Sequence, residues 1–165
     1  MSLAEAAARA DDLAQAGDER SLATLRVQWD EEIEAAARDA DYRVRALAYR
    51  SIAQFRFRQK LQLLRRGLED ESPAVRGSAL IALEGLSRDH PGDVNSFRPL
   101  LHDLAARDPN LAVRRLAVIC LKNGSAHRDT IQLLEGIAES DESEAELKKT
   151  ARVVHAALKK KATAR

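Results

Sequence analysis

The chain has 165 residues, of which 45% are hydrophobic and 32% are charged, a composition typical of a folded, water-soluble domain. It carries 27 Lys and Arg against 26 Asp and Glu, so its formal net charge of +1 gives no overall attraction to nucleic acid or membrane. One cysteine excludes an internal disulfide framework, and no apolar run reaches the roughly 18 residues of a membrane span. The alanine-rich, acidic N-terminus does not resemble a signal peptide, so we expect a cytoplasmic protein.

Strong helix formers dominate the sequence, because Ala, Leu, Glu and Arg are frequent and aromatic residues make up only 4%. β-branched residues occur singly rather than in the alternating runs that strands require. We therefore predict an all-α fold that forms one domain over residues 1–165. Its predicted parts in chain order are an N-terminal cap (1–28), four repeat units (29–56, 57–87, 94–123 and 126–160) and a basic tail (161–165).

Four segments of the chain repeat one pattern, which is clearest in DESPAVRGSALIALEGL at residues 70–86. The pattern begins with an apolar residue and then a cation: Val44-Arg45, Val75-Arg76, Val113-Arg114 and Leu147-Lys148. An alanine stands four places after the apolar residue: Ala48, Ala79, Ala117 and Ala151. An acid stands five places before it: Asp39, Asp70, Asp108 and Glu142. Positions 0, +4 and +8 share one face of a helix, so the pattern predicts a helix that buries this face.

A shorter apolar pattern precedes three of these helices. It contains the leucine pairs Leu63-Leu64, Leu100-Leu101 and Leu133-Leu134, which predict a first helix in each unit. Each unit is therefore a helical hairpin, and successive units are 31, 38 and 34 residues apart.

Local signals mark the boundaries of the predicted helices. Ser72-Pro73 and Asp108-Pro109 each place a capping side chain beside a proline, which is typical of the first turn of a helix. Asn123-Gly124 is typical of a helix end, because both residues tolerate a positive φ. We predict a long loop over residues 87–95, SRDHPGDVN, which accounts for the 38-residue spacing.

The order acid, Val-Arg, Ala and Leu on the second helix of such a hairpin resembles the HEAT repeat family. It is most similar to the short bacterial form called the phycobilisome-lyase HEAT-like repeat, and the resemblance covers residues 29–158. The resemblance implies a right-handed α-solenoid of about four hairpins, with second helices on the concave side. It implies binding more than chemistry, so we expect a non-enzymatic scaffold or adaptor with a protein partner and no cofactor.

The resemblance also implies a structural role for the repeated arginine, which in HEAT proteins commonly bonds to the acid of an adjacent repeat. The expected ladder consists of Asp39, Arg45, Asp70, Arg76, Asp108 and Arg114. A binding role for the same arginines is the alternative that the sequence leaves open.

Other positions on the second helices are candidates for a concave contact surface. Some are cations without an assigned ladder partner, and others stand five places after the start of the pattern. The predicted partner-binding set is Tyr49, Leu80, Arg115, Val118, Lys149 and Arg152. Tyr and Arg are favoured anchors at protein interfaces, and the cations favour an acidic partner.

A second interpretation places nucleic acid on QFRFRQK, the turn between the first two units. Arg56, Arg58 and Lys60 of this basic edge, with the basic C-terminal tail, can meet phosphates while Phe55 and Phe57 stack on bases. Core packing of the two phenylalanines is the structural alternative. Acids gather in the turns within units, so we expect acidic and basic edges on opposite sides of the stack.

Enzymatic interpretations find little support in the side chains. The 4 histidines form no HExxH or similar ligand spacing, and the 7 glycines form no phosphate-binding loop. Ser125, His127 and Asp129 are too close in sequence to converge as a catalytic triad. Cys120 aligns with Ser51, Ala82 and Val154 of the other units, which favours a buried thiol in the core. Trp29-Asp30 resembles the aromatic and aspartate pair of HEAT-like glycosylases, but the spacing of Trp29 favours core packing. A HEAT-like glycosylase or lyase subunit is the third interpretation.

Overall fold

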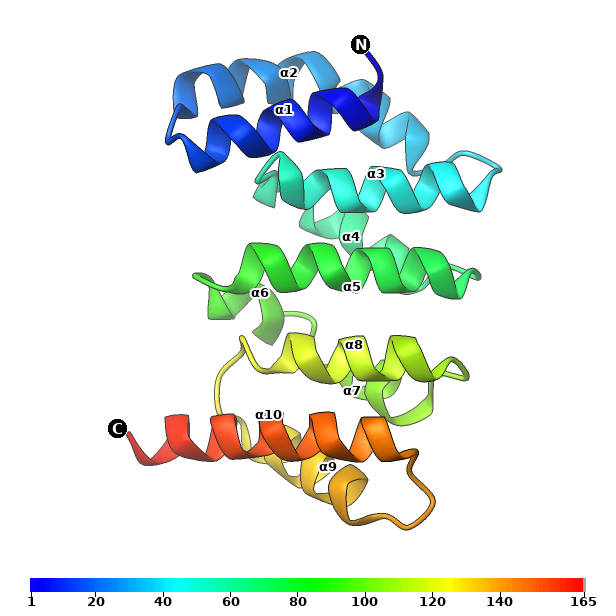
Figure 1. The fold of residues 1–165 in the computed structure, drawn as a ribbon, viewed down its shortest axis with the longest axis vertical. Helices are drawn as coiled ribbons and strands as arrows, with labels where there is room; N and C mark the ends of the chain where they lie inside the picture. The colour runs from blue at the N-terminus through cyan, green and yellow to red at the C-terminus, as the bar shows by residue number, and fades with distance from the viewer. Residues whose placement is uncertain (165) are drawn as a thin grey trace. The chain divides into compact units, whose positions relative to one another are not determined.

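Figure 1 shows a computed structural model of the chain, which describes residues 1–164. All regular elements within that range are α-helices or one short 3-10 helix, so the predicted all-α fold is confirmed. The chain divides into two compact units, Met1–Leu86 and Ser87–Arg165. Arg165, the last residue of the predicted basic tail, lies outside the described residues.

Unit 1 contains six helices in the described range. They are α1 (Leu3–Gln15), α2 (Glu19–Ala36), α3 (Tyr42–Gln54), η1 (Arg58–Lys60), α4 (Leu61–Leu68) and α5 (Pro73–Ser87), whose last residue belongs to unit 2. The first three pack against one another in pairs. The residues predicted as an N-terminal cap therefore form α1 and the first half of α2, which pairs with α3 as a hairpin.

The break between α1 and α2 depends on a glycine in the left-handed region. Gly17 has a φ of 74°, and the amides of Gly17 and Asp18 donate to the carbonyl oxygens of Ala14 and Leu13 at 3.1 and 3.0 Å. These bonds satisfy carbonyl groups that the end of α1 leaves free. The Asp18 side chain then accepts from the Ser21 amide at 3.1 Å and caps α2.

The turn after α3 uses the same geometry without a glycine. Arg56 has a φ of 51°, and the Phe57 amide donates to the carbonyl of Ile52 at 3.0 Å. A left-handed conformation at a residue with a Cβ costs roughly 1–2 kcal/mol. Phe55 and Phe57 are buried, with 0% and 7% exposure, so the structure has the core packing that was the alternative to base stacking.

Unit 2 contains two hairpins and one short additional helix. Its helices are α6 (Pro91–Asn95), α7 (Arg98–Arg107), α8 (Leu111–Leu121), α9 (Arg128–Glu139) and α10 (Ala145–Thr163). α7 packs on α8, α9 packs on α10, and the second helices α8 and α10 pack side by side (Figure 1). The prediction of a loop over residues 87–95 was wrong in part, because Pro91–Asn95 form α6.

Two boundary predictions also need correction. Pro73 begins α5 as expected, but Pro109 lies before α8, which Asn110 caps by accepting from the Val113 amide at 3.1 Å. Gly124 follows α8 without a positive φ. Its role is close packing instead, because a Cβ there would lie 2.9 Å from Cγ1 of Val94.

The repeated pattern forms the core of both units. All four alanines of the pattern have 0% exposure, and the apolar residues that begin it at Val75, Val113 and Leu147 are at most 1% exposed. Val44, at the start of the first repeat, is half-buried. The predicted buried face is therefore confirmed in full on α5 and α8, while on α3 and α10 one position, Val44 or His155, is half-buried.

Candidate protein-binding surface

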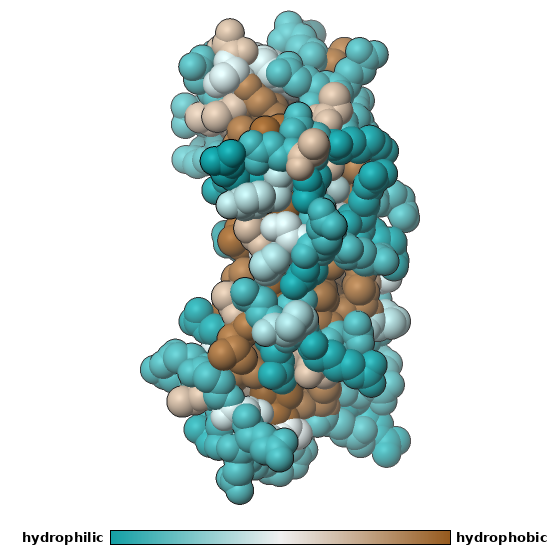
Figure 2. All heavy atoms as spheres, turned by 90° about the vertical axis from the view of Figure 1, so that its right-hand side faces the viewer, coloured by the Kyte–Doolittle hydropathy of each residue, from teal (hydrophilic) through white to brown (hydrophobic). Residues whose placement is uncertain are grey.

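The predicted ladder acids Asp39, Asp70 and Asp108 share one local role. The Oδ1 atom of each accepts a hydrogen bond from the amide two residues later, at 2.8, 2.9 and 2.9 Å. This bond fixes the turn that leads into the second helix, which is the usual role of an Asp beside a turn. In Figure 2 the part of unit 1 that carries such turns, in the upper half of the view, is mostly hydrophilic.

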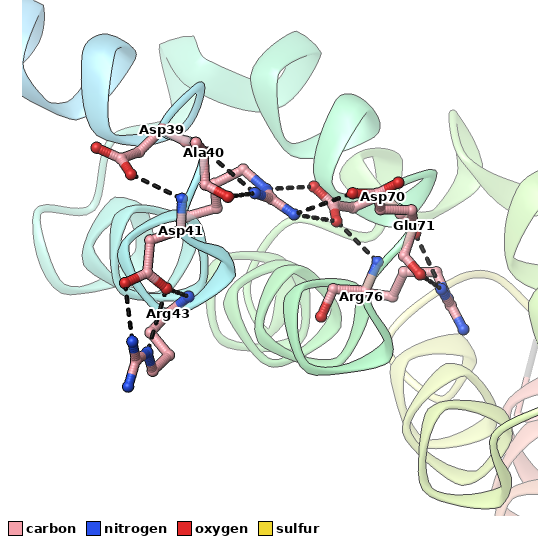
Figure 3. A network of polar contacts seen from close by, with 9 residues as sticks. Asp39, Ala40, Asp41, Arg43, Asp70, Glu71 and Arg76 are labelled. Carbon is pink, nitrogen blue, oxygen red and sulfur yellow. Dashed lines mark hydrogen bonds and ion pairs between the residues drawn. The ribbon is translucent and has the colours of Figure 1, made fainter.

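Arg45 joins two of these turns in unit 1. Its Nε donates to Oδ2 of Asp70 at 2.9 Å, and its Nη2 donates to Oδ1 of the same carboxylate at 3.1 Å. Its Nη1 donates to the carbonyl oxygens of Asp39 and Ala40 at 2.9 and 3.1 Å, and Figure 3 labels these three partner residues. The Arg45 and Asp70 side chains are each 12% exposed. A planar guanidinium that pairs both oxygens of a carboxylate is the strong form of a charge-assisted hydrogen bond.

This arrangement also changes the ionisation of Asp70. Burial by itself raises the pKa of the Asp70 carboxyl, but the hydrogen bonds from Arg45 and from the Ser72 amide outweigh it, so the pKa is lowered. The carboxylate is therefore the favoured form in the folded protein.

Of the two later arginines of the repeated pattern, Arg76 repeats the backbone contacts of Arg45 and Arg114 does not. Nη1 of Arg76 donates to the carbonyl oxygens of Asp70 and Glu71 at 2.9 and 3.2 Å. Nε of Arg114 donates to the carbonyl oxygen of Ala105 at 2.9 Å. All three repeated arginines thus bond to backbone carbonyls near the preceding turn. The carboxylate partner expected for Arg114 is replaced by the Ala105 carbonyl.

Half of the predicted partner-binding set does not reach the surface. Tyr49, Leu80 and Val118 all have 0% exposure, so these residues cannot contact a partner as predicted. With about 100° between successive residues, position +5 lies about 100° from the centre of the buried face. That places it on a flank of the helix, where a neighbouring helix can cover it. The Tyr49 ring, for example, lies against Gly67 of α4.

Positions +2 and +6 lie about 160° from the centre of the buried face. Position +2 is exposed on α8 and α10, whereas Ala46 of α3 and Gly77 of α5 are buried there. Arg115 and Lys149 stand at +2 and are exposed. Ile81 and Val153 stand at +6 and are 50% and 59% exposed. Position +6 was not predicted as a contact position, although a helical wheel drawn from the same buried stripe places it on the exposed side.

In unit 2 this face contains both apolar and cationic side chains. Leu111 is 48% exposed on α8, two turns before the half-buried Ile119, and Arg115 lies between them in sequence. Nε of Arg115 donates to Oγ1 of Thr150 at 3.0 Å, so its side chain bridges α8 and α10. The α8–α10 face is defined here as Leu111, Arg115, Ile119, Lys149 and Val153.

Arg152, the remaining member of the predicted set, is exposed beside this face. Its Nη2 lies 3.5 Å from the carbonyl oxygen of Ala138, at the limit of a hydrogen bond. It therefore stays available on the flank of α10.

The predicted basic edge differs from a free cationic surface. Lys60 is only 9% exposed, because its Nζ is ion-paired with Asp30 and with Glu34, the latter at 2.6 Å, and it lies 5.0 Å from the centre of the Phe57 ring. Nη1 of Arg56 pairs with Oδ1 of Asp11 at 2.8 Å. Arg58 is exposed. Lys60 is thus a structural residue, and its place in a binding edge was predicted wrongly.

The basic C-terminal segment is also partly engaged. Residues up to Thr163 continue α10, and Nζ of Lys161 donates to the carbonyl oxygens of Lys122 and Gly124 at 2.6 and 2.9 Å. A lysine that satisfies carbonyls after the end of α8 contributes to folding as well as to charge.

The residues weighed as catalytic have structural contacts. Ser125 accepts from Nη2 of Arg98 at 2.9 Å, and Nδ1 of His127 accepts from the Asp129 amide at 3.1 Å and caps α9. Cys120 is buried. Asp30 pairs with Lys60, and Trp29 beside it is half-buried.

Two kinds of site are absent from the part of the chain that the structure describes. Within residues 1–164, no three His, Cys, Asp or Glu side chains are grouped so that they could hold a metal ion. None of the described helices has the length and apolar character needed to cross a bilayer.

Comparison with protein families identifies the repeated hairpins. Residues 30–103 match the family described as HEAT repeats. A search of curated proteins found no match. The matched part begins in α2 and ends in α7, so it includes the first two copies of the repeated pattern and the hairpin helices that surround them. Over residues 30–103 the chain is therefore similar to the HEAT repeats, in agreement with its all-helical hairpin architecture.

Proposed function

We propose that this protein is a non-enzymatic scaffold that binds a protein partner through the exposed face of its second helices. The observation that carries the proposal is the mixture of exposed apolar side chains at position +6 of α5 and α10 and exposed cations at position +2 of α8 and α10. Ile81 and Val153 are at least half exposed there, although each belongs to a helix whose other valine and leucine side chains are buried. Stacked hairpin repeats commonly present such a face to a partner.

The partner on this proposal has an acidic surface. Helix α8 contains no Asp or Glu, and Glu146 is the single acidic residue of α10. Six Lys or Arg residues on α10 and two on α8 add to the positive charge. Opposite charge accelerates the encounter of two proteins and selects among partners.

Several finer expectations belong to the same proposal. The arginine and acid ladder has a structural role, supported by the Arg45 contacts with Asp70 and by the Arg76 contacts with backbone carbonyls. The hairpins form a right-handed solenoid whose concave side carries the second helices, as the HEAT resemblance implies. The resemblance to the phycobilisome-lyase HEAT-like form and a cytoplasmic location stay predictions.

Nucleic-acid binding at the basic edge has less support than protein binding at the second-helix face. Binding to nucleic acid needs cations that are free to neutralise phosphates and so displace the counterions of the nucleic acid. Lys60 is buried among two carboxylates, and Arg56 is paired with Asp11. Two of the three predicted phosphate contacts are therefore already neutralised within unit 1.

The proposal is tested by photo-crosslinking from single positions in extracts of the source cells. A photoreactive amino acid in place of Ile81 or Val153 reports on the second-helix face. The matched control carries the photoreactive amino acid in place of Val27, which is 80% exposed on α2. We expect a discrete protein adduct from Ile81 or Val153 and none from Val27. The adduct should resist nuclease.

Three results would contradict the proposal. One is an adduct from Val27 only, which would place the contact on the first helices. Another is a nuclease-sensitive adduct together with retention on DNA or RNA that weakens steeply with salt, which would favour nucleic acid. The third is an absence of protein adducts at all three positions.

A further inference from the structure

We infer that the α8–α10 face is a docking site for an acidic segment of a partner protein that carries apolar anchors. This inference rests on the proposed function and goes further by naming one surface within unit 2 and the chemistry of its occupant. It depends on side chains of two helices that pack directly against each other.

The first step is the position of the apolar side chains. Leu111 and Ile119 are eight residues apart on α8, so they lie about 12 Å apart along one side of the helix. Val153 is exposed on the neighbouring helix α10, with 59% of its surface accessible. Isolated apolar residues at a surface are ordinary, but three that share one face with few carboxylates form a small apolar patch.

The second step is the charge around this patch. Arg115 lies between the two apolar residues of α8, and its single hydrogen bond to a described residue goes to the neutral Thr150 hydroxyl. Lys149 is exposed, and it makes no ion pair with any described residue. Both cations therefore keep their full charge for a ligand. The one acid of α10, Glu146, lies in the first turn, where it complements the helix dipole.

The third step distinguishes a peptide from nucleic acid. Proteins that bind single strands through their bases use aromatic side chains as stacking platforms. The uncharged side chains of the α8–α10 face are aliphatic, and the face contains no aromatic residue. Aliphatic side chains beside cations fit a segment in which apolar anchors alternate with Asp or Glu.

The test uses methyl NMR of the full chain, because Leu111, Ile119 and Val153 each provide methyl groups at the site. The probe is a synthetic amphipathic peptide of Glu and Leu, added at increasing concentration. We expect shifts of the Leu111, Ile119 and Val153 methyl signals, while the exposed Val27 methyl signals on α2 do not move. A peptide with Ser in place of every Leu, and one with Lys in place of every Glu, should each bind at least tenfold more weakly.

Charge reversal supplies a matched comparison. Arg115→Glu with Lys149→Glu should weaken binding of the Glu and Leu peptide roughly tenfold, through lost attraction and added repulsion. The control is Arg107→Glu with Arg128→Glu, which changes the net charge equally at exposed positions on α7 and α9. The control should change affinity less than twofold. Val153→Ser tests the apolar contribution without touching a charge, and it should weaken binding several-fold.

The inference is wrong if both double variants weaken binding equally, since the attraction would then be nonspecific. It is also wrong if the Glu and Leu peptide does not move the three methyl signals, or if a single-stranded oligonucleotide moves them more strongly. The crosslinking experiment separates these failures from failure of the proposed function. A protein adduct at Val153 whose crosslinked segment is not acidic would retain the scaffold and overturn this inference.

Discussion

Arg45 and Asp70 are held together by two hydrogen bonds, at 2.9 and 3.1 Å, although 25 residues separate them in the sequence. Arg45 belongs to α3, and Asp70 belongs to the turn that leads into α5. The same carboxylate accepts from the Ser72 amide at 2.9 Å. One carboxylate therefore fixes its own turn and ties it to the previous hairpin.

The Asp70→Asn substitution should lower the free energy of unfolding by about 1.5–3 kcal/mol, the usual loss for a charge-assisted hydrogen bond. Asp39→Asn is the matched control, because Asp39 occupies the same repeat position and caps its turn through the Asp41 amide. An amide oxygen can keep that bond, so the control should change stability little. Urea unfolding of both variants measures the difference. Equal losses would mean that the turn, rather than the pair with Arg45, is the source of the stability.

The Asp70 pair should make stability depend on pH. The pKa of Asp70 is lowered in the folded protein, because the bonds from Arg45 and the Ser72 amide outweigh the effect of burial. Its contribution is therefore complete above the unfolded pKa of about 3.9 and is lost as pH falls through the lower folded value. The stability difference between the unmodified protein and Asp70→Asn should be constant from about pH 5 to 7 and shrink below about pH 4. Urea midpoints at pH 7 and pH 3 provide the measurement, and a difference that persists unchanged at pH 3 would contradict the assignment.

Gly67→Ala should destabilise the protein by about 1–3 kcal/mol. A Cβ at this position would lie 2.9 Å from Cε1 and Cζ of Tyr49 and 3.0 Å from Cβ of Ala79. Gly136→Ala is the control, since it also lies within a helix but has no atom within 4 Å of a built Cβ. It should raise stability by about 0.5–1 kcal/mol, because alanine favours the helix. Melting temperatures that move in the same direction for both variants would contradict the packing at Tyr49.

Ala117→Leu should cost about 1–3 kcal/mol through overpacking, because Ala117 has 0% exposure on α8. Ala156→Leu places the same side chain at an exposed position of α10 and should change stability by less than about 0.5 kcal/mol. Thermal unfolding followed by circular dichroism compares the two. If Ala117→Leu melts at the same temperature as the unmodified protein, the assignment of the repeated alanines to the buried helix face is wrong.

The positions of the core and of the candidate surface were predictable to different extents. The buried stripe of Val75 and Ala79 followed from helical period alone, and it is confirmed. The exposed cations Arg115 and Lys149 were also identified in advance. The choice of Tyr49 as a contact residue was wrong, because a flank position is buried or exposed according to the helix beside it. Here α4 approaches Tyr49 at Gly67.

The sequence by itself determined the all-helical class, the hairpin repeat and the buried face of each second helix, because these depend on local propensity and a period of about 3.6 residues. Only the tertiary structure decided the role of side chains whose partners are distant in sequence. Lys60 is buried because Asp30 and Glu34, 30 and 26 residues earlier, approach it from α2. Arg45 reaches Asp70, whereas Arg114 bonds to a backbone carbonyl at the equivalent repeat position. Such choices depend on how neighbouring helices pack, and no local pattern of residue types contains that information.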